Sequence, residues 1–164
     1  MALQQHLFRS YDPRDEVDLG GFVGSLAAYA ASVAGLVGAS RAAGKTLPER
    51  YEVADLVIGG VATHKLTRLL SSASVTSPLR APFTEFEEAA GSGEHHESPR
   101  GEHGVRHTVG ELLTCPFCLA VWVASAYVGG LVAAPRATRA AAAVLSVVAA
   151  SDALQHVYAR LRTN

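Results

Sequence analysis

Long apolar stretches without charge alternate with polar segments along this chain. Residues 21–40 and 117–134 contain no charged side chain at all. A helix that spans a membrane needs about 20 consecutive, mostly apolar residues. Both stretches are therefore predicted to be membrane-spanning helices.

Two further stretches are apolar but are interrupted by ionisable residues. Residues 53–70 contain Asp55 and end in a basic run, and residues 140–160 contain Asp152. An acid at the centre of a span costs about 2.5–3.5 kcal/mol on insertion scales. These stretches can span only if their polar groups lie near an interface or pair inside a bundle. The alternative is two spans plus two amphipathic helices that lie in the interface.

The predicted fold is all-α and integral to the membrane: a four-helix transmembrane bundle with two strong and two marginal spans. A long, partly flexible cytoplasmic loop joins the second and third spans. Residues 85–107 of this loop are acidic and rich in Gly and Ser, which is typical of a flexible segment. The predicted organisation is a polar N-terminal segment, 1–20, and a membrane domain, 21–164, with spans at about 21–40, 53–70, 117–134 and 140–160.

Charge adds an orientation to this picture. The chain has 14 basic and 15 acidic residues, so its net charge of -1 gives no basic field for nucleic acid. Nine basic residues fall on the side of the N-terminus and five on the other side. Because basic residues favour the inner side, both termini and the long loop are predicted to be cytoplasmic. Only two of the basic residues are lysine, which is typical of a GC-rich bacterium, so the predicted location is a bacterial cytoplasmic membrane.

The only two cysteines lie at the start of a predicted span, in the motif Cys115-Pro116-Phe117-Cys118. Thiolates at this spacing can bind a soft metal ion or close a small disulfide. One such pair supplies half of a tetrahedral zinc site, and His103 and His107 could supply the other half. The bland alternative is that both cysteines are simply small packing residues.

A second group of polar residues comes from the marginal spans. His64 and Arg68 are four residues apart, with Lys65 beside them, and Asp152 and His156 have the same spacing. Residues four apart share one face of a helix. Asp152 is therefore expected to be neutralised by Lys65, Arg68 or His64. The alternative is that these polar side chains only join the helices and extend to the membrane interface. Asp55 is expected to be interfacial, and His95 and His96 to be solvated.

Three blocks resemble a bacterial family known as domain of unknown function family 1360. They are residues 62–68 (ATHKLTR), 75–84 (VTSPLRAPFT) and 110–122 (GELLTCPFCLAVW). The resemblance covers about residues 56–150 and implies a small membrane protein of unassigned activity. By motif match it points to His64, Lys65, Arg68, Thr76, Pro78, Arg80, Pro82, Phe83, Glu111, Cys115, Pro116, Cys118 and Trp122.

This resemblance changes the candidate sites. His103 and His107 lie outside the matching blocks, so a metal site is shifted toward His64, Asp152 or His156. Arg80 lies between two prolines that stiffen its segment, and Glu111 is expected to pair with it or to favour the dipole at the start of its helix. The candidate metal ligands are Cys115, Cys118, His64 and His156. The predicted polar cluster is His64, Lys65, Arg68, Arg80, Glu111, Asp152 and His156.

No motif in the chain predicts a reaction, so the sequence favours a non-enzymatic membrane component that binds a partner. The expected partners are the lipid bilayer and either another protein or a second copy of the chain. The first alternative is a zinc or iron–sulfur site at the cysteine motif. The second alternative is a membrane thiol–disulfide oxidoreductase.

Overall fold

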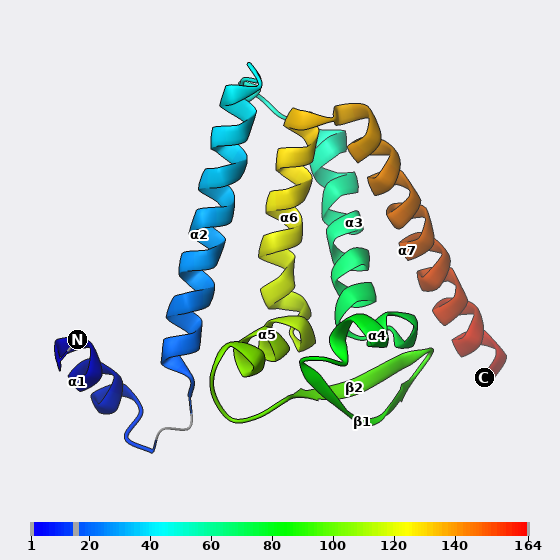
Figure 1. The fold of residues 1–164 in the computed structure, drawn as a ribbon. Coiled ribbons are helices and arrows are strands. Elements are labelled where there is room, and N and C mark those ends of the chain that lie inside the picture. Colours follow the sequence, from blue (N-terminus) through cyan, green and yellow to red (C-terminus); the bar gives the residue numbers. More distant parts are fainter. Residues whose placement is uncertain (1, 15–16, 164) are drawn as a thin grey trace.

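The computed structural model describes residues 2–14 and 17–163, and it places four long helices side by side with a small polar assembly at one end (Figure 1). In chain order the elements are α1 (Ala2–Tyr11), α2 (Leu19–Ala42), α3 (Val53–Ser71), the 3-10 turn η1 (Ser74–Thr76), α4 (Ser77–Arg80), β1 (Thr84–Gly91), β2 (Glu94–Pro99), α5 (Val105–Thr114), α6 (Pro116–Ala133) and α7 (Pro135–Thr163).

The four long helices α2, α3, α6 and α7 coincide with the four predicted apolar stretches. The largest difference is at α7, which begins at Pro135, whereas the sequence predicts a start near residue 140. Proline is favoured in the first turn of a helix because its φ is already helical and its missing N–H is not needed there. The Thr138 hydroxyl also donates to the Ala134 carbonyl oxygen at 3.0 Å, which stabilises this turn.

The apolar side chains of the long helices face outward. Leu26 on α2 is 68% exposed, and Val147 on α7 is 70% exposed. Few large apolar side chains are buried between the helices. Water-soluble domains bury such residues, whereas helices in a bilayer present them to lipid. The distribution is therefore that of a membrane-associated protein.

By length and composition, three of the described helices could cross a membrane: α2, α6 and α7. The marginal stretch 140–160 thus belongs to a helix that meets this requirement. The other marginal stretch, 53–70, forms α3, which is not among the three because it carries Asp55, Lys65 and Arg68 in 19 residues. A four-helix transmembrane bundle remains a prediction.

Glycines bring the helices into close contact. At Gly59 of α3, an added Cβ would lie only 2.2 Å from the ring of Tyr127 on α6. The Tyr127 hydroxyl donates to the Asp55 carbonyl oxygen at 2.8 Å. On the other side of α6, Gly129 accommodates Leu36 of α2 in the same way. Small residues of this kind allow helix axes to approach where no hydrophobic drive joins them.

The loop between α3 and α6 contains secondary structure that the sequence does not predict. Residues 84–99 form an antiparallel hairpin of β1 and β2 inside the segment predicted to be flexible. Its turn, Gly91-Ser92-Gly93, has positive φ at all three residues. Glycine reaches such angles without strain, so the Gly-Ser-Gly sequence closes a hairpin here. The expectation of a wholly helical fold was wrong at these two strands, and the flexibility of residues 85–107 stays a prediction.

The hairpin packs with the short helices at one end of the bundle. The His95 amide donates to the Ser72 carbonyl oxygen at 2.8 Å, and the Ser74 amide donates to the Gly93 carbonyl oxygen at 2.8 Å. At Gly110 of α5, an added Cβ would lie 2.5 Å from the Phe83 carbonyl oxygen. We call this assembly the polar cap; it consists of Ser74–Arg80, Thr84–Pro99 and Val105–Thr114.

Candidate functional site

Arg80 is the largest fully buried side chain among the described residues, with 1% of its surface exposed. Its Nε and Nη2 atoms donate to the Glu97 carboxylate of β2 at 2.9 and 2.6 Å. Its Nη1 atom donates to the carbonyl oxygens of Leu70 and Ala73 at 2.9 and 3.1 Å. Arg80 therefore joins the end of α3 and the turn after it to the hairpin.

Two hydroxyl groups complete the shell around the Arg80 guanidinium. Nη1 also donates to the Thr76 hydroxyl at 2.7 Å, and Nη2 to the Ser77 hydroxyl at 3.1 Å. A guanidinium has five N–H groups in a fixed plane, and every one of its nitrogens is engaged within the chain. The Arg80 side chain therefore holds the parts of the cap together.

Glu97 is the partner that the sequence interpretation missed. Besides Arg80, it accepts hydrogen bonds from the Thr84 hydroxyl at 2.7 Å and the Ser77 hydroxyl at 3.0 Å. Burial alone raises the pKa of Glu97, but these hydrogen bonds and the Arg80 charge outweigh it and lower the pKa to about 2. Glu97 is therefore ionised at neutral pH, and a buried pair of opposite charges lies at the centre of the cap.

The expected pairing of Arg80 with Glu111 was wrong. The Glu111 carboxylate lies in the last turn of α5, 3.6 Å from Nε2 of His107 on the same helix. Glu97 was overlooked because it belongs to the segment interpreted as flexible. One sequence signal could have revealed the Glu97 pairing. Gly91-Ser92-Gly93 is a turn sequence with a strand-length segment on each side, which is typical of a hairpin.

His95 also departs from its prediction as a solvated loop residue. Its Nδ1 atom lies 3.0 Å from the Ser77 hydroxyl, and its ring packs edge-on against Phe86 at 5.0 Å between centroids. His96 has the expected exposure and lies 3.2 Å from the Glu88 carboxylate. The prediction holds for only one of these two histidines, because alternate residues of a strand face opposite sides.

The predicted cluster at the ends of α3 and α7 separates into distinct ion pairs. Lys65 Nζ lies 2.5 Å from the Asp152 carboxylate, so one of the three predicted cations does neutralise this acid. Arg68 pairs instead with Glu94 of the hairpin. The side chains of His64 and His156 are exposed. The seven residues therefore do not converge on one site.

Asp55 is more than an interfacial acid at the end of a helix. Its carboxylate accepts two hydrogen bonds from Arg139 of α7, at 2.9 Å from Nε and 2.7 Å from Nη2. The Asp55 side chain is 11% exposed. This bidentate pair joins the start of α3 to the start of α7, at the end of the helices opposite the cap (Figure 1).

Cys115 and Cys118 are joined as a disulfide, with their Cα atoms 5.3 Å apart. Cys115 is the N-cap residue of α6, and its sulfur accepts a hydrogen bond from the Cys118 amide at 3.2 Å. A cavity of about 410 Å³ beside the pair is lined by Phe22, Leu112 and Glu111, among others. One Glu111 carboxylate oxygen is buried there without a hydrogen-bond partner among the described residues.

The described residues predicted to bind a metal do not form a ligand set. Within residues 2–14 and 17–163, no group of three or more His, Cys, Asp or Glu side chains is placed to hold a metal ion. Cysteines joined to each other have no thiolate to offer a metal, since the thiolate is the ligand form. The suggested donor His107 is engaged by Glu111, and the exposed His64 and His156 lie on other helices, α3 and α7.

These features define a small helical protein with three helices of membrane-spanning character and an ordered cap held by a buried ion pair. The chain belongs to the family described as protein of unknown function (DUF1360), whose profile matches residues 58–158. The matched region begins within α3, includes the whole polar cap and the cysteine pair, and ends in α7.

A curated relative is the sporulation protein YjcA of Bacillus subtilis (strain 168). It is 39% identical over 72 residues, which are 42% of this chain and 60% of that protein. The chain therefore covers less than two thirds of the length of that relative. No solved structure gives a significant match to this chain.

Proposed function

We propose that this chain is a non-enzymatic membrane component whose polar cap binds an extended segment of a partner protein. The observation that carries the proposal is the free edge of β1. Among the described residues, the sheet has only two strands, and β1 pairs with β2 alone. Seven of the eight residues of β1 are exposed.

A free strand edge is a template for another strand. It presents unpaired backbone N–H and C=O groups, and many recognition domains use such an edge to add a strand from a partner. The buried Arg80–Glu97 pair fixes β2 to the end of α3, and β2 in turn holds β1. The edge is therefore presented by a rigid base, which reduces the entropy lost on binding.

The charge of β1 indicates the kind of segment that fits. The strand carries Glu85, Glu87 and Glu88 and no basic residue, and Phe86 between them is 62% exposed. Complementary charge speeds association and selects among partners. We therefore propose a basic, extended segment with an apolar residue that packs against Phe86. Because the curated relative is named a sporulation protein, a sporulating bacterium is the first place to seek this partner.

A photo-crosslinking amino acid at position 86 is expected to trap a discrete protein adduct in cells. Changing Glu85, Glu87 and Glu88 together to glutamine is expected to reduce the yield of this adduct several-fold, because the complementary charge is lost. The measurement is a gel shift of the tagged chain after illumination, followed by mass spectrometry of the adduct.

The matched control carries the same crosslinker at Phe117, which is 87% exposed at the start of α6 and outside the cap. It is expected to give no such protein adduct. An adduct made of two copies of this chain would show that the strand edge binds a second copy of the chain and not another protein. Equal yields with and without the three glutamates would contradict the proposed charge recognition.

We also propose that the four long helices cross the membrane together and that the cap faces the cytoplasm. Pairing supports the insertion of α3, because Asp55 is neutralised by Arg139 and Lys65 by Asp152. The excess of basic residues on the cap side, nine against five, supports the orientation.

A second candidate function is thiol–disulfide exchange at the cysteine pair. The disulfide itself and the exposed Cys118 favour it over a metal site. A partner dithiol would reduce the pair by attack of its thiolate on one sulfur, with the other sulfur leaving as a thiolate. The second thiol of the partner would then close its own disulfide, so that two electrons and two protons pass to Cys115 and Cys118.

Labelling of the cysteines with a membrane-impermeant maleimide tests the orientation and this second function together. Because the chain has no other cysteine, no background has to be removed. We expect labelling of inverted vesicles only after treatment with a glutathione buffer, and no labelling of intact cells. Labelling of intact cells would overturn the orientation. Labelling of vesicles without any reductant would show free thiols and oppose a redox-active disulfide.

A further inference from the structure

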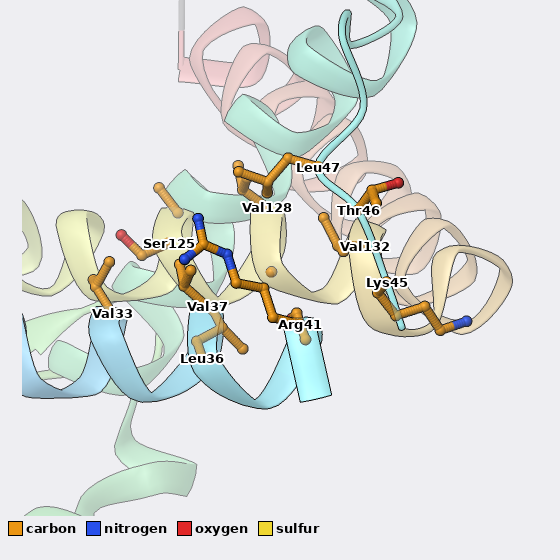
Figure 2. Close-up of a pocket in the computed structure, with 13 residues that line it drawn as sticks. Val33, Leu36, Val37, Arg41, Lys45, Thr46, Leu47, Ser125, Val128 and Val132 are labelled. Atoms are coloured by element: carbon orange, nitrogen blue, oxygen red, sulfur yellow. The ribbon is translucent and has the colours of Figure 1, made fainter. Parts of the chain in front are cut away.

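A cavity of about 580 Å³ lies between α2, the segment that follows it, and α6. Its walls are mostly apolar and include Val33, Leu36, Val128 and Val132 (Figure 2). It lies at the end of the bundle opposite the cap, where α2 ends. Neither the function proposed for the cap nor the cysteine pair involves this cavity.

A basic residue, Arg41, also lines this cavity. Its side chain folds back along α2, and its guanidinium lies among Val33, Val37 and Ser125 (Figure 2). Within the described part of the chain, Arg41 has no acidic partner, and no acidic residue lines the cavity. Arg41 is exposed at this cavity, so its charge is available to an anion from outside the chain.

Lys45 supplies a second cation at the mouth of the same cavity. It follows the last turn of α2, and its ammonium group points away from the apolar walls (Figure 2). Arginine binds a phosphate through two parallel hydrogen bonds, whereas lysine binds it as a flexible point charge. The two charged groups point in different directions (Figure 2), so Lys45 would reach a phosphate at Arg41 by rotation of its flexible side chain.

We propose that this cavity binds an anionic phospholipid, with its phosphate at Arg41 and Lys45 and one acyl chain along Val33, Leu36 and Val128. The last turn of a spanning helix lies at headgroup depth, where a basic side chain is within reach of a lipid phosphate. A free phosphate would satisfy the two cations but would leave the apolar walls empty. This inference rests on the proposed insertion of α2 and α6 in a membrane.

The test uses the full chain purified in detergent and then exchanged into nanodiscs. We expect phosphatidylglycerol to raise the midpoint temperature of unfolding relative to phosphatidylcholine with the same acyl chains. Native mass spectrometry is expected to retain one phosphatidylglycerol molecule per chain. Arg41→Gln should abolish both effects, and Lys45→Gln should weaken them.

The matched control is Arg136→Gln, because Arg136 lies at the same end of the bundle, in the first turn of α7, and does not line the cavity. It is expected to keep the full response to phosphatidylglycerol. If Arg41→Gln fails to fold, Val33→Trp provides a second variant, since it fills the acyl-chain position and leaves both cations. It should lose the bound lipid as well.

Four outcomes would overturn the proposal. They are an equal effect of the two lipids, an equal effect of inorganic phosphate alone, an unchanged response in Arg41→Gln, and a second copy of the chain in the cavity. Fractionation of cells distinguishes a failure of the lipid-site proposal from a failure of the proposed membrane insertion. A chain found outside the membrane fraction would refute insertion itself, whereas an inserted chain without lipid preference would refute only the lipid site.

Discussion

Replacing Arg80 with alanine is expected to unfold the polar cap while leaving the long helices assembled. The variant removes every hydrogen bond that holds Glu97, the turn after α3 and the hairpin to one guanidinium. It also leaves the Glu97 carboxylate buried without its counter-charge. Removing one member of a buried ion pair costs about 3–5 kcal/mol, which is a large part of the stability of a small domain.

The measurement is hydrogen exchange of the backbone amides of β1 and β2, which should lose protection in Arg80→Ala. Fluorescence of the single tryptophan, Trp122 on α6, reports the helices separately. The variant Arg80→Lys is expected to restore little, since an ammonium group cannot reproduce the planar set of donors.

Arg100→Ala serves as the matched control for this prediction. Arg100 directly follows β2 of the cap and donates to the Thr84 carbonyl oxygen at 2.7 Å, but its side chain is 39% exposed. Arg100 also lies 3.8 Å from the Glu85 carboxylate. Because that ion pair is exposed and contributes little, loss of the hydrogen bond is expected to dominate and to cost about 0.5–1.5 kcal/mol. Equal loss of protection in the Arg80 and Arg100 variants would contradict the central role of the buried pair.

The long helices could be predicted from the sequence because an apolar block is a local signal. Each of the four apolar blocks predicts one helix. The predicted bounds agree with the observed ones within a few residues, except at the start of α7, Pro135. The hairpin was harder to recognise. Its strands contain few β-branched or aromatic residues, and they are stabilised largely by contacts with Arg80 and the turn after α3. The composition of the segment contains no information about these contacts with distant residues, so it could not predict the hairpin.

The same distinction applies to the candidate site. Helical spacing placed Lys65, Arg68 and Asp152 at one end of the bundle, and the Lys65–Asp152 pair follows from it. Spacing could not identify Glu97 as the partner of Arg80, because the two belong to elements whose contact depends on the hairpin register. Nor could it separate a disulfide from a metal site at Cys115 and Cys118, since both need the same two sulfurs.

Reversing the charge of either Asp55 or Arg139 alone is expected to destabilise the packing of α3 against α7 strongly. Asp55→Arg would place two guanidinium groups together, and Arg139→Asp would place two carboxylates together, where a bidentate pair now lies. The double variant, with both charges exchanged, is expected to recover much of the loss because the pair is restored in reverse. The measurement is the midpoint temperature of unfolding in one detergent, where each single variant should lose roughly 5 °C or more.

The ion pair of Lys65 and Asp152 provides the internal comparison, since it joins the same two helices at the other end. Its side chains are 20% and 40% exposed, and it has a single hydrogen bond, so Lys65→Met is expected to cost less than either reversal. Coupling between Asp55 and Arg139 is measured by comparing the double variant with the sum of the single variants. Strictly additive losses would show that the two side chains act independently. A recovery in the double variant would instead establish that α3, despite its charges, is retained among the apolar helices by its pairing with α7.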